Sequence, residues 1–320
     1  MPAVDKPLPE LLQYTGSSPC PADLDAYWAR GIAEMEAVDP QLEWVDAAFQ
    51  TSYAKCSSLY FTGTGGARIH AKVARPNPLP ETATPLLVMF HGYTGSAPGW
   101  LTMMSYVAAG FTVVGLDCRG QGGLSEDTVP TKGNTLHGHI IKGLDDHKDK
   151  LYYRNVYLDT VQLTRIGMGF DWVDAERVGC TGGSQGGALS LACAALEPRI
   201  KRVFSMYPFL SDFKRVWNMG LDQHAYSGLR DYMRRFDPLH EREDEIFETL
   251  GYIDVSNLAP KIEGEALMAL TLLDNICPPS TQFAAYNAIR SEKTKLVYQD
   301  YGHEGLLGCD EKAFEFFMNL

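Results

Sequence analysis

The chain has 320 residues, a formal net charge of −12 and a composition ordinary for a soluble globular enzyme. This length is enough for one large domain or two small ones with a sizeable core. The acidic balance disfavours nucleic acid and anionic membranes as partners, because either would have to approach a predominantly negative surface. A neutral or cationic small molecule is easier to accommodate.

The opening residues, MPAVDKPLPE, carry acids and prolines where a secretory signal needs a basic start followed by an apolar run. No later stretch reaches the roughly 20 apolar residues that span a bilayer. We therefore expect a soluble, cytoplasmic protein. The seven cysteines are scattered and include no C-x-x-C pair, which predicts reduced, mostly buried thiols.

The first predicted elements differ in kind from those that follow them. Two acid-rich amphipathic segments, 8–14 and 22–37, predict helices, and the alternating runs 53–63 and 67–76 predict an antiparallel strand pair. After a turn-rich stretch, PLLVMF and FTVVGLD are short and almost entirely apolar, which is typical of strands covered on both faces. Between them, GWLTMMSYVAAG has a helical period and ends in a glycine.

Strands and helices continue to alternate to the end of the chain. Strands are predicted in the stretches that begin at residues 177, 202, 265 and 295, with RVFSMYPFL (202–210) as one whole strand, and helices at 155–173, 280–290 and 311–320. This alternation predicts an α/β fold with a mainly parallel twisted sheet and helices on both faces. Residues 211–261 interrupt it with an aromatic, charged and helical segment, which we interpret as a cap-like insertion. We expect one domain over 1–320, with N-terminal helices and antiparallel strands in 1–80.

A glycine-flanked serine lies where one predicted strand becomes a helix. The residues Gly182-Gly183-Ser184-Gln185-Gly186 fit G-x-S-x-G, the nucleophile elbow, in which the serine occupies a strained turn. Side chains at the first and last glycine would collide with the neighbouring strand and helix. The alternative reading is that the glycines simply allow a helix to pack closely, so the motif needs an acid and a base.

Both partners follow later strands in the order that a hydrolase requires. Asp274 ends an apolar run, and His303 lies in a glycine-flanked loop after the last predicted strand. We assign Ser184 as nucleophile, His303 as general base and then general acid, and Asp274 as the group that orients the imidazole. A lone Asp at a strand end is otherwise more often a turn former, and a lone His more often a surface or core residue.

Catalysis of acyl transfer also needs two fixed donors at the developing alkoxide. We predict the backbone N–H groups of Gln185 and of Tyr93, the latter in the loop HGYTGS after the strand PLLVMF. An ordinary glycine turn is the alternative for that loop. The polar stretch with His137, His139 and His147 has a spacing like that of metal ligands. Its acidic residues are equally typical of turns and helix caps, so no metal is expected.

Several stretches together resemble one known family, the acetyl xylan esterase / cephalosporin C deacetylase family (carbohydrate esterase family 7), which has the α/β-hydrolase fold. The resemblance covers nearly the whole chain and rests on RGQGG (119–123), GGSQGG (182–187), YPFLSDF (207–213), LLDNICPPSTQFAAYN (272–287) and GHEG (302–305). It implies the same nucleophile, acid, base and oxyanion donors as the argument above.

The resemblance further implies a serine carboxylesterase that removes acetyl groups from acetylated xylo-oligosaccharides and 3′-acetyl cephalosporins without a cofactor. It implies a homohexamer, built as a trimer of dimers, which a monomeric mass in light scattering would contradict. The alternatives are another α/β-hydrolase, such as a peptidase or thioesterase, and a catalytically silent ligand-binding relative.

Some residues of the motifs have no catalytic role that the sequence reveals. Arg119 looks like a buried anchor for loops beside the site, Glu304 is expected to orient its own loop, and the glycines let the backbone pass closely. These structural-motif residues are Arg119, Gly120, Gln121, Gly122, Gly123 and Glu304. For the acyl pocket we predict Tyr93, Tyr207 and Pro208, which follow strands that should end beside the serine, and such an aromatic pocket would favour acetyl over longer acyl chains.

Overall fold

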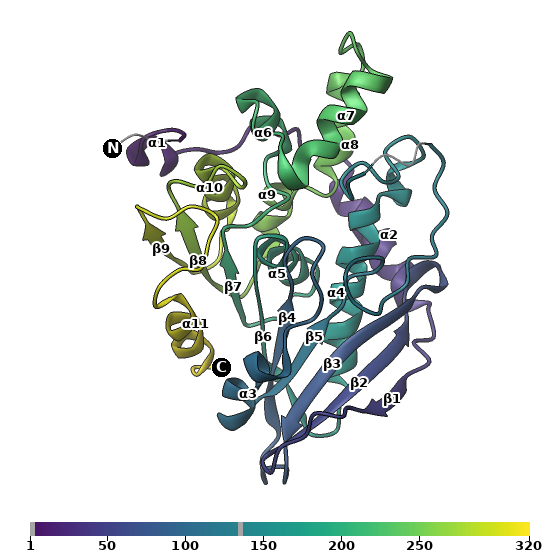
Figure 1. Ribbon diagram of the computed structural model, residues 1–320, viewed down its shortest axis with the longest axis vertical. Helices are drawn as coiled ribbons and strands as arrows, with labels where there is room; N and C mark the ends of the chain where they lie inside the picture. Colours follow the sequence, from purple (N-terminus) through teal and green to yellow (C-terminus); the bar gives the residue numbers. More distant parts are fainter. Residues whose placement is uncertain (1–3, 134–136) are drawn as a thin grey trace.

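A computed structural model describes residues 4–133 and 137–320, and in these residues nine strands form a single sheet. The strand order is β1-β2-β3-β5-β4-β6-β7-β8-β9 (Figure 1). The strands are β1 (Glu43–Asp46), β2 (Ala54–Thr62), β3 (Arg68–Pro76), β4 (Thr84–Phe90), β5 (Thr112–Leu116), β6 (Val173–Gly183), β7 (Arg202–Met206), β8 (Glu265–Thr271) and β9 (Lys293–Tyr298). Strands β1, β2, β3 and β5 pair antiparallel, and every pair from β5 through β4 to β9 is parallel.

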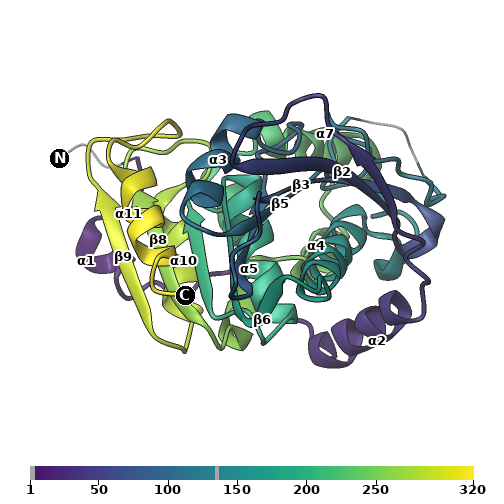
Figure 2. The same ribbon diagram turned by 90° about the horizontal axis from the view of Figure 1, so that it is seen from below.

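Helices cover both faces of the parallel part of the sheet, as the apolar runs predict. Helices α4 (Tyr152–Met168), α5 (Gln185–Leu196) and α10 (Pro279–Ala288) pack on one face, with α2 (Leu24–Glu36) outside them, whereas α3 (Trp100–Ala108) and α11 (Cys309–Phe317) pack on the other (Figure 2). Every residue of β5, and all of β4 except one, is buried, because such a strand meets helices on both sides. The mainly parallel sheet flanked by helices is confirmed.

A short helix, α1 (Leu8–Leu11), lies near the N-terminus. The segment 211–261 holds four α-helices. They are α6 (Phe213–Met219), α7 (Ser227–Phe236), α8 (Glu243–Gly251) and α9 (Val255–Leu258). In Figure 1, α6, α7 and α8 lie in the upper part of the molecule, at the end toward which the parallel strands run. The segment therefore stands at the edge of the sheet where the site residues are expected.

One predicted strand is too long. The prediction placed 202–210 in a strand, but β7 ends at Met206 and Tyr207 has a φ of 32°. The backbone turns there because its polar groups bind other segments: the Tyr207 N–H donates to the Ala269 carbonyl, and the Phe209 N–H donates to the Ser184 carbonyl. The apolar residues after Met206 are buried as a turn beside Ser184.

The seven cysteines are free thiols, and all except Cys20 are buried, as predicted. Among the described residues, none of the helices combines the length and the apolar character that a membrane span requires.

Candidate active site

The serine lies in a turn of a single residue between a strand and a helix. Strand β6 ends at Gly183 and α5 begins at Gln185, so Ser184 alone makes the turn, with a φ of 56°. This positive φ is a strained conformation for a residue with a Cβ, as expected of a nucleophile elbow. A Cβ at Gly182 would lie 2.5 Å from the backbone of Gly186, and one at Gly186 would lie 2.2 Å from the Phe90 carbonyl oxygen. The steric reason predicted for both glycines is confirmed.

The structure brings together the three side chains that the sequence order selects. His303 Nε2 lies 3.0 Å from Ser184 Oγ, and His303 Nδ1 lies 2.8 Å from Asp274 Oδ2. A carboxylate can only accept, so Nδ1 carries the proton that it shares with Asp274 and Nε2 is left to accept the serine proton. This chain of hydrogen bonds is the arrangement in which a histidine can activate a hydroxyl as a nucleophile.

Asp274 is fully buried, and its free lone pairs are satisfied locally. Its Oδ1 accepts the N–H groups of Ile276 and Cys277, both at 2.8 Å. Ligand atoms of Asp274, Cys277 and His303 lie within 4.8 Å of one another, the one metal-like grouping among the described ranges. Burial, and then the charge of Asp274, raises the pKa of the Cys277 thiol well above its usual range, so the thiol is protonated beside the carboxylate. The carboxylate bonds fit a histidine-orienting role better.

Two backbone N–H groups near the serine are free to bind an oxyanion. The N–H of Gln185 is the first of α5 and has no acceptor within the helix. The N–H of Tyr93 donates to no group in the part of the chain that the structure describes. The positive end of the α5 dipole adds to the attraction for negative charge. Both donors are those that the sequence predicts.

The loop that carries Tyr93 is held at its start by His91. Burial lowers the pKa of His91, so the ring is neutral. Its Nε2 must accept, because the Cys118 N–H donates to it at 3.0 Å, and its Nδ1–H therefore donates to the Gly92 carbonyl at 2.7 Å. The bond from Cys118 fixes the loop to the segment after β5, and the bond to Gly92 fixes the ring within the loop.

Asp117, which precedes the serine in the chain, fixes the same loop from the other side. It is 2% exposed, and its carboxylate accepts from His70 Nδ1 at 2.6 Å and from the N–H groups of Ala97 and Leu124. Burial raises the pKa of Asp117, but these hydrogen bonds outweigh burial and hold the pKa at about 2. Its role is structural.

We expect the low pKa of Asp117 to contribute to acid stability. A carboxyl whose pKa is lowered on folding stabilises the fold above its unfolded pKa, and the stabilisation is lost as the pH falls toward about 2. In Asp117→Asn, the free energy of unfolding should fall by roughly 2 kcal/mol near neutral pH and change less with acidification than in the parent. Urea unfolding curves across the acid range check this, and parallel curves for the two proteins would contradict it.

Of the predicted pocket and loop residues, Tyr207 and Glu304 lie close to His303. The Tyr207 ring packs on the His303 ring at 4.6 Å between centroids, and the Tyr207 hydroxyl donates to the Glu304 carbonyl. The Glu304 carboxylate accepts the Gly302 N–H at 3.0 Å, so it closes its own loop. Tyr207 and Pro208 are buried and Tyr93 is half-buried. Tyr207 thus supports the histidine, and a pocket role for these residues stays a prediction.

Arg119 is completely buried and binds a helix on the far side of the loops. Its guanidinium makes two bonds of 2.6 and 2.7 Å to Asp159 of α4 and donates to the Thr64 carbonyl. The glycines after Arg119 are needed for space and conformation. Gly120 has a φ of 63°, a Cβ at Gly122 would lie 2.6 Å from the Thr94 oxygen, and one at Gly123 would overlap the Asp117 carboxylate.

The other histidines that the sequence weighed do not form a shared site. His137 contacts Ser227 and Asp231 of α7, whereas the ring of His139 stacks on Tyr152 at 4.7 Å. His147 lies 3.3 Å from Asp149 in its own turn. Each therefore has a different local partner, and the metal-like spacing in the sequence has no counterpart among the described residues.

The family model for acetyl xylan esterase (AXE1) matches residues 1–320. The chain belongs to the acetyl xylan esterase family. It is similar to the crystal structure of acetyl xylan esterase 1 from Thermoanaerobacterium sp., with 54% identity, coverage of 98% of this chain and 99% of that one, and a TM-score of 0.97. The acetyl xylan esterase from Paenibacillus sp. gives 32% identity, coverage of 98% and 99%, and a TM-score of 0.93.

Among curated proteins, an acetyl esterase of Xylanibacter ruminicola is 34% identical over 175 residues. That alignment includes 53% of this chain and spans 36% of the relative's length. Membership of the acetyl xylan esterase family assigns the chain to the carboxylic ester hydrolases of the α/β-hydrolase fold.

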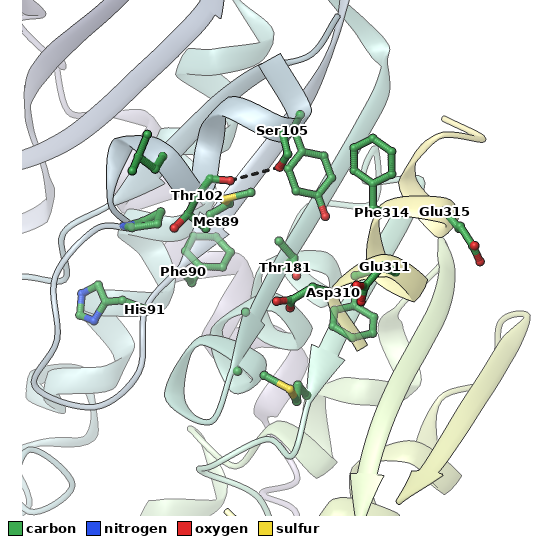
Figure 3. Close-up of a pocket in the computed structure, with 18 residues that line it drawn as sticks. Met89, Phe90, His91, Thr102, Ser105, Thr181, Asp310, Glu311, Phe314 and Glu315 are labelled. Carbon is green, nitrogen blue, oxygen red and sulfur yellow. Dashed lines mark hydrogen bonds between the residues drawn. The ribbon is translucent and has the colours of Figure 1, made fainter. Parts of the chain in front are cut away.

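A cavity of about 860 Å³ lies beside the site rather than at it. Figure 3 shows its position between α3 and α11, over the ends of the central strands. Gly182 and Gly183 line it, but Ser184 and His303 do not. The predicted pocket residues Tyr93, Tyr207 and Pro208 are also absent from its lining. The cavity therefore borders the end of β6 without including the reacting serine or its histidine.

Sequence reasoning missed two features around the serine. Cys277 belongs to the Asp274 turn, and its place three residues after a strand-end acid was the available signal. Gln121 stood in a quoted motif without a role, and Tyr153 was not considered. These two residues reach Gln185 only through the folded sheet, so no spacing in the sequence indicates the contact.

Proposed function

We propose that this family member is a serine esterase that removes acetyl groups from small esters, including acetylated xylo-oligosaccharides and 3′-acetyl cephalosporins. The observation that carries the proposal is the hydrogen-bond chain from Ser184 through His303 to Asp274. The names of the similar proteins, acetyl xylan esterase and acetyl esterase, support acetyl as the acyl group.

In the proposed mechanism, Ser184 Oγ attacks the acetyl carbonyl carbon while His303 Nε2 takes the serine proton. The carbonyl oxygen becomes an alkoxide that the N–H groups of Tyr93 and Gln185 bind. The C–O bond to the alcohol then breaks, and His303 returns the proton to the leaving oxygen. Water repeats the same steps on the acyl-enzyme and releases acetate.

Asp274 keeps His303 in the tautomer that these steps require and stabilises the imidazolium that forms. The two backbone bonds on Asp274 Oδ1 and the burial of its carboxyl hold it in that geometry. From the resemblance we also propose a homohexamer, which the mass measured by light scattering tests.

We expect the rate of hydrolysis to fall steeply with acyl length. The predicted pocket residues are packed with other rings: the Tyr207 ring packs on His303, and the Tyr93 ring packs on Phe209 at 5.7 Å. Each extra methylene that finds no space costs roughly 1–3 kcal/mol of transition-state binding. Measuring kcat/KM for p-nitrophenyl acetate, butyrate and octanoate checks this. Equal values for acetate and octanoate would contradict a small acyl pocket, and acetylated xylo-oligosaccharides then test the alcohol side.

A further inference from the structure

The two proposed oxyanion donors belong to different segments, and one side chain joins these segments. Tyr93 is in the loop after β4, whereas Gln185 begins α5. Gln121 lies between them: its Oε1 accepts the N–H of Thr94 at 2.8 Å, and its Nε2 donates to Gln185 Oε1 at 2.9 Å. Thr94 directly follows the first donor, and Gln185 is itself the second.

The orientation of both amides follows from a backbone group. The Thr94 N–H can only donate, so the Gln121 atom that faces it must be the oxygen. The Gln121 Nε2 then faces Gln185, whose facing atom must be its Oε1. The remaining Gln185 Nε2 donates back to Gln121 Oε1 at 3.1 Å and toward the carbonyls of His91 and Gly92. The two carboxamides thus donate to and accept from each other. Rotating either amide by 180° would place its oxygen against the oxygen of the other.

Further bonds hold this pair in place. The Tyr153 hydroxyl donates to Gln185 Oε1 at 2.9 Å, and the Tyr152 hydroxyl accepts from Gln121 Nε2 at 2.9 Å while it donates to the Arg119 carbonyl. The side chain of Gln185 is fully buried. A polar network in which every member is paired is rigid, because any displacement leaves a buried group unsatisfied.

We propose that Gln121 is a positioning residue that sets the spacing between the two N–H groups of the oxyanion hole. This inference rests on the proposed esterase function. Stabilisation of the alkoxide depends on donors that are fixed before the reaction, at about 3 Å from the oxygen. In the described part of the chain the Gln121 side chain bonds to Thr94, Tyr152 and Gln185 and to no triad residue, so it acts through the loop at Thr94 and through Gln185.

Two substitutions separate this role from general stability. Gln121→Met keeps the length and removes every hydrogen bond. Gln121→Glu keeps the acceptor for the Thr94 N–H but places a carboxylate oxygen against Gln185 Oε1. We expect kcat to fall roughly tenfold or more in both variants. This loss is smaller than the roughly 10²–10³-fold fall in kcat that follows removal of a whole oxyanion donor. KM should change much less.

The pH dependence of the glutamate variant gives the decisive readout. A protonated carboxyl can donate to Gln185 Oε1 as the amide does, whereas a carboxylate cannot. Burial and the facing acceptor favour the neutral form. The ratio of kcat in Gln121→Glu to kcat in the parent should therefore fall as the pH rises from about 5 to about 8. The same ratio for Gln121→Met should stay constant, because methionine does not titrate.

Gln162→Glu is the matched control. Gln162 is a glutamine of α4 that is 6% exposed, and its Nε2 donates to the Thr62 carbonyl at 2.9 Å, away from the serine. This variant should lower the thermal midpoint but leave kcat per folded molecule and its pH profile as in the parent. Folded protein is counted by circular dichroism in each case.

The outcomes separate the two proposals. If the parent protein shows no ester hydrolysis, or hydrolysis that does not depend on Ser184, the esterase proposal is overturned. An active parent whose kcat is retained in both Gln121 variants would overturn the positioning role alone. Because the methionine variant carries no buried charge, it still decides the question if the glutamate variant does not fold.

Discussion

Replacement of Ser184 by alanine should reduce kcat/KM for p-nitrophenyl acetate by roughly 10⁴-fold or more, while the protein stays folded. The Ser184 hydroxyl contacts His303 Nε2 and is the nucleophile of the proposed mechanism. When a triad serine is lost, the remaining rate comes from the oxyanion hole and from binding alone. Alanine also has a Cβ, so the strained φ of 56° at this position is unchanged.

Ser190→Ala is the matched control for this substitution. Ser190 lies in the same helix α5, is fully buried, and donates its hydroxyl to the Gly186 carbonyl at 2.8 Å. The control should keep its esterase activity, whereas Ser184→Ala should keep the parent's circular dichroism spectrum and thermal midpoint without the activity. If Ser184→Ala hydrolyses acetate esters at the parent's rate, the nucleophile has been misassigned.

The largest expected loss of stability follows removal of the Arg119 guanidinium. Arg119 and Asp159 are both fully buried, and their two short bonds leave no water contact to either charge. Burial raises the pKa of Asp159, and Arg119 opposes that effect. Arg119→Met would leave an uncompensated carboxyl in the core and should lower the free energy of unfolding by about 3–5 kcal/mol, as measured from urea unfolding.

The double variant Arg119→Met, Asp159→Leu tests the reason for that loss. If the unpaired carboxyl causes most of it, removing both charges should recover more than half of the lost stability. Some loss should remain, because the Thr64 carbonyl also loses a donor. A double variant as unstable as the single one would show that the guanidinium acts through its other contacts and not through the ion pair.

The fold was predictable because its parallel strands are short, apolar and regularly separated by helices. The site was predictable where local rules apply: a strained turn requires glycines at 182 and 186, and each functional side chain follows a strand. The predicted length of β7 was wrong because the prediction followed apolar character alone. The chain instead turns at Tyr207, at a positive φ, and its backbone binds the neighbouring segments. Apolar residues fill buried turns as well as strands.

Contacts between distant residues could not be read from the sequence. Gln121 and Gln185 meet because β5 and β6 end at the same edge of the sheet, on either side of β4. The partner of Arg119 is on α4, in a helix whose buried face includes polar residues that the apolar pattern does not reveal. Pairing of this kind depends on how layers pack, which residue types and spacing leave undetermined.

All twelve residues of α5 are buried, so this helix is enclosed by protein along its whole length. Counterions in solution screen exposed charges over about 10 Å, but they cannot approach a dipole that the fold surrounds. We therefore expect the field that α5 directs toward Ser184 to weaken less in concentrated salt than the field of an exposed helix would.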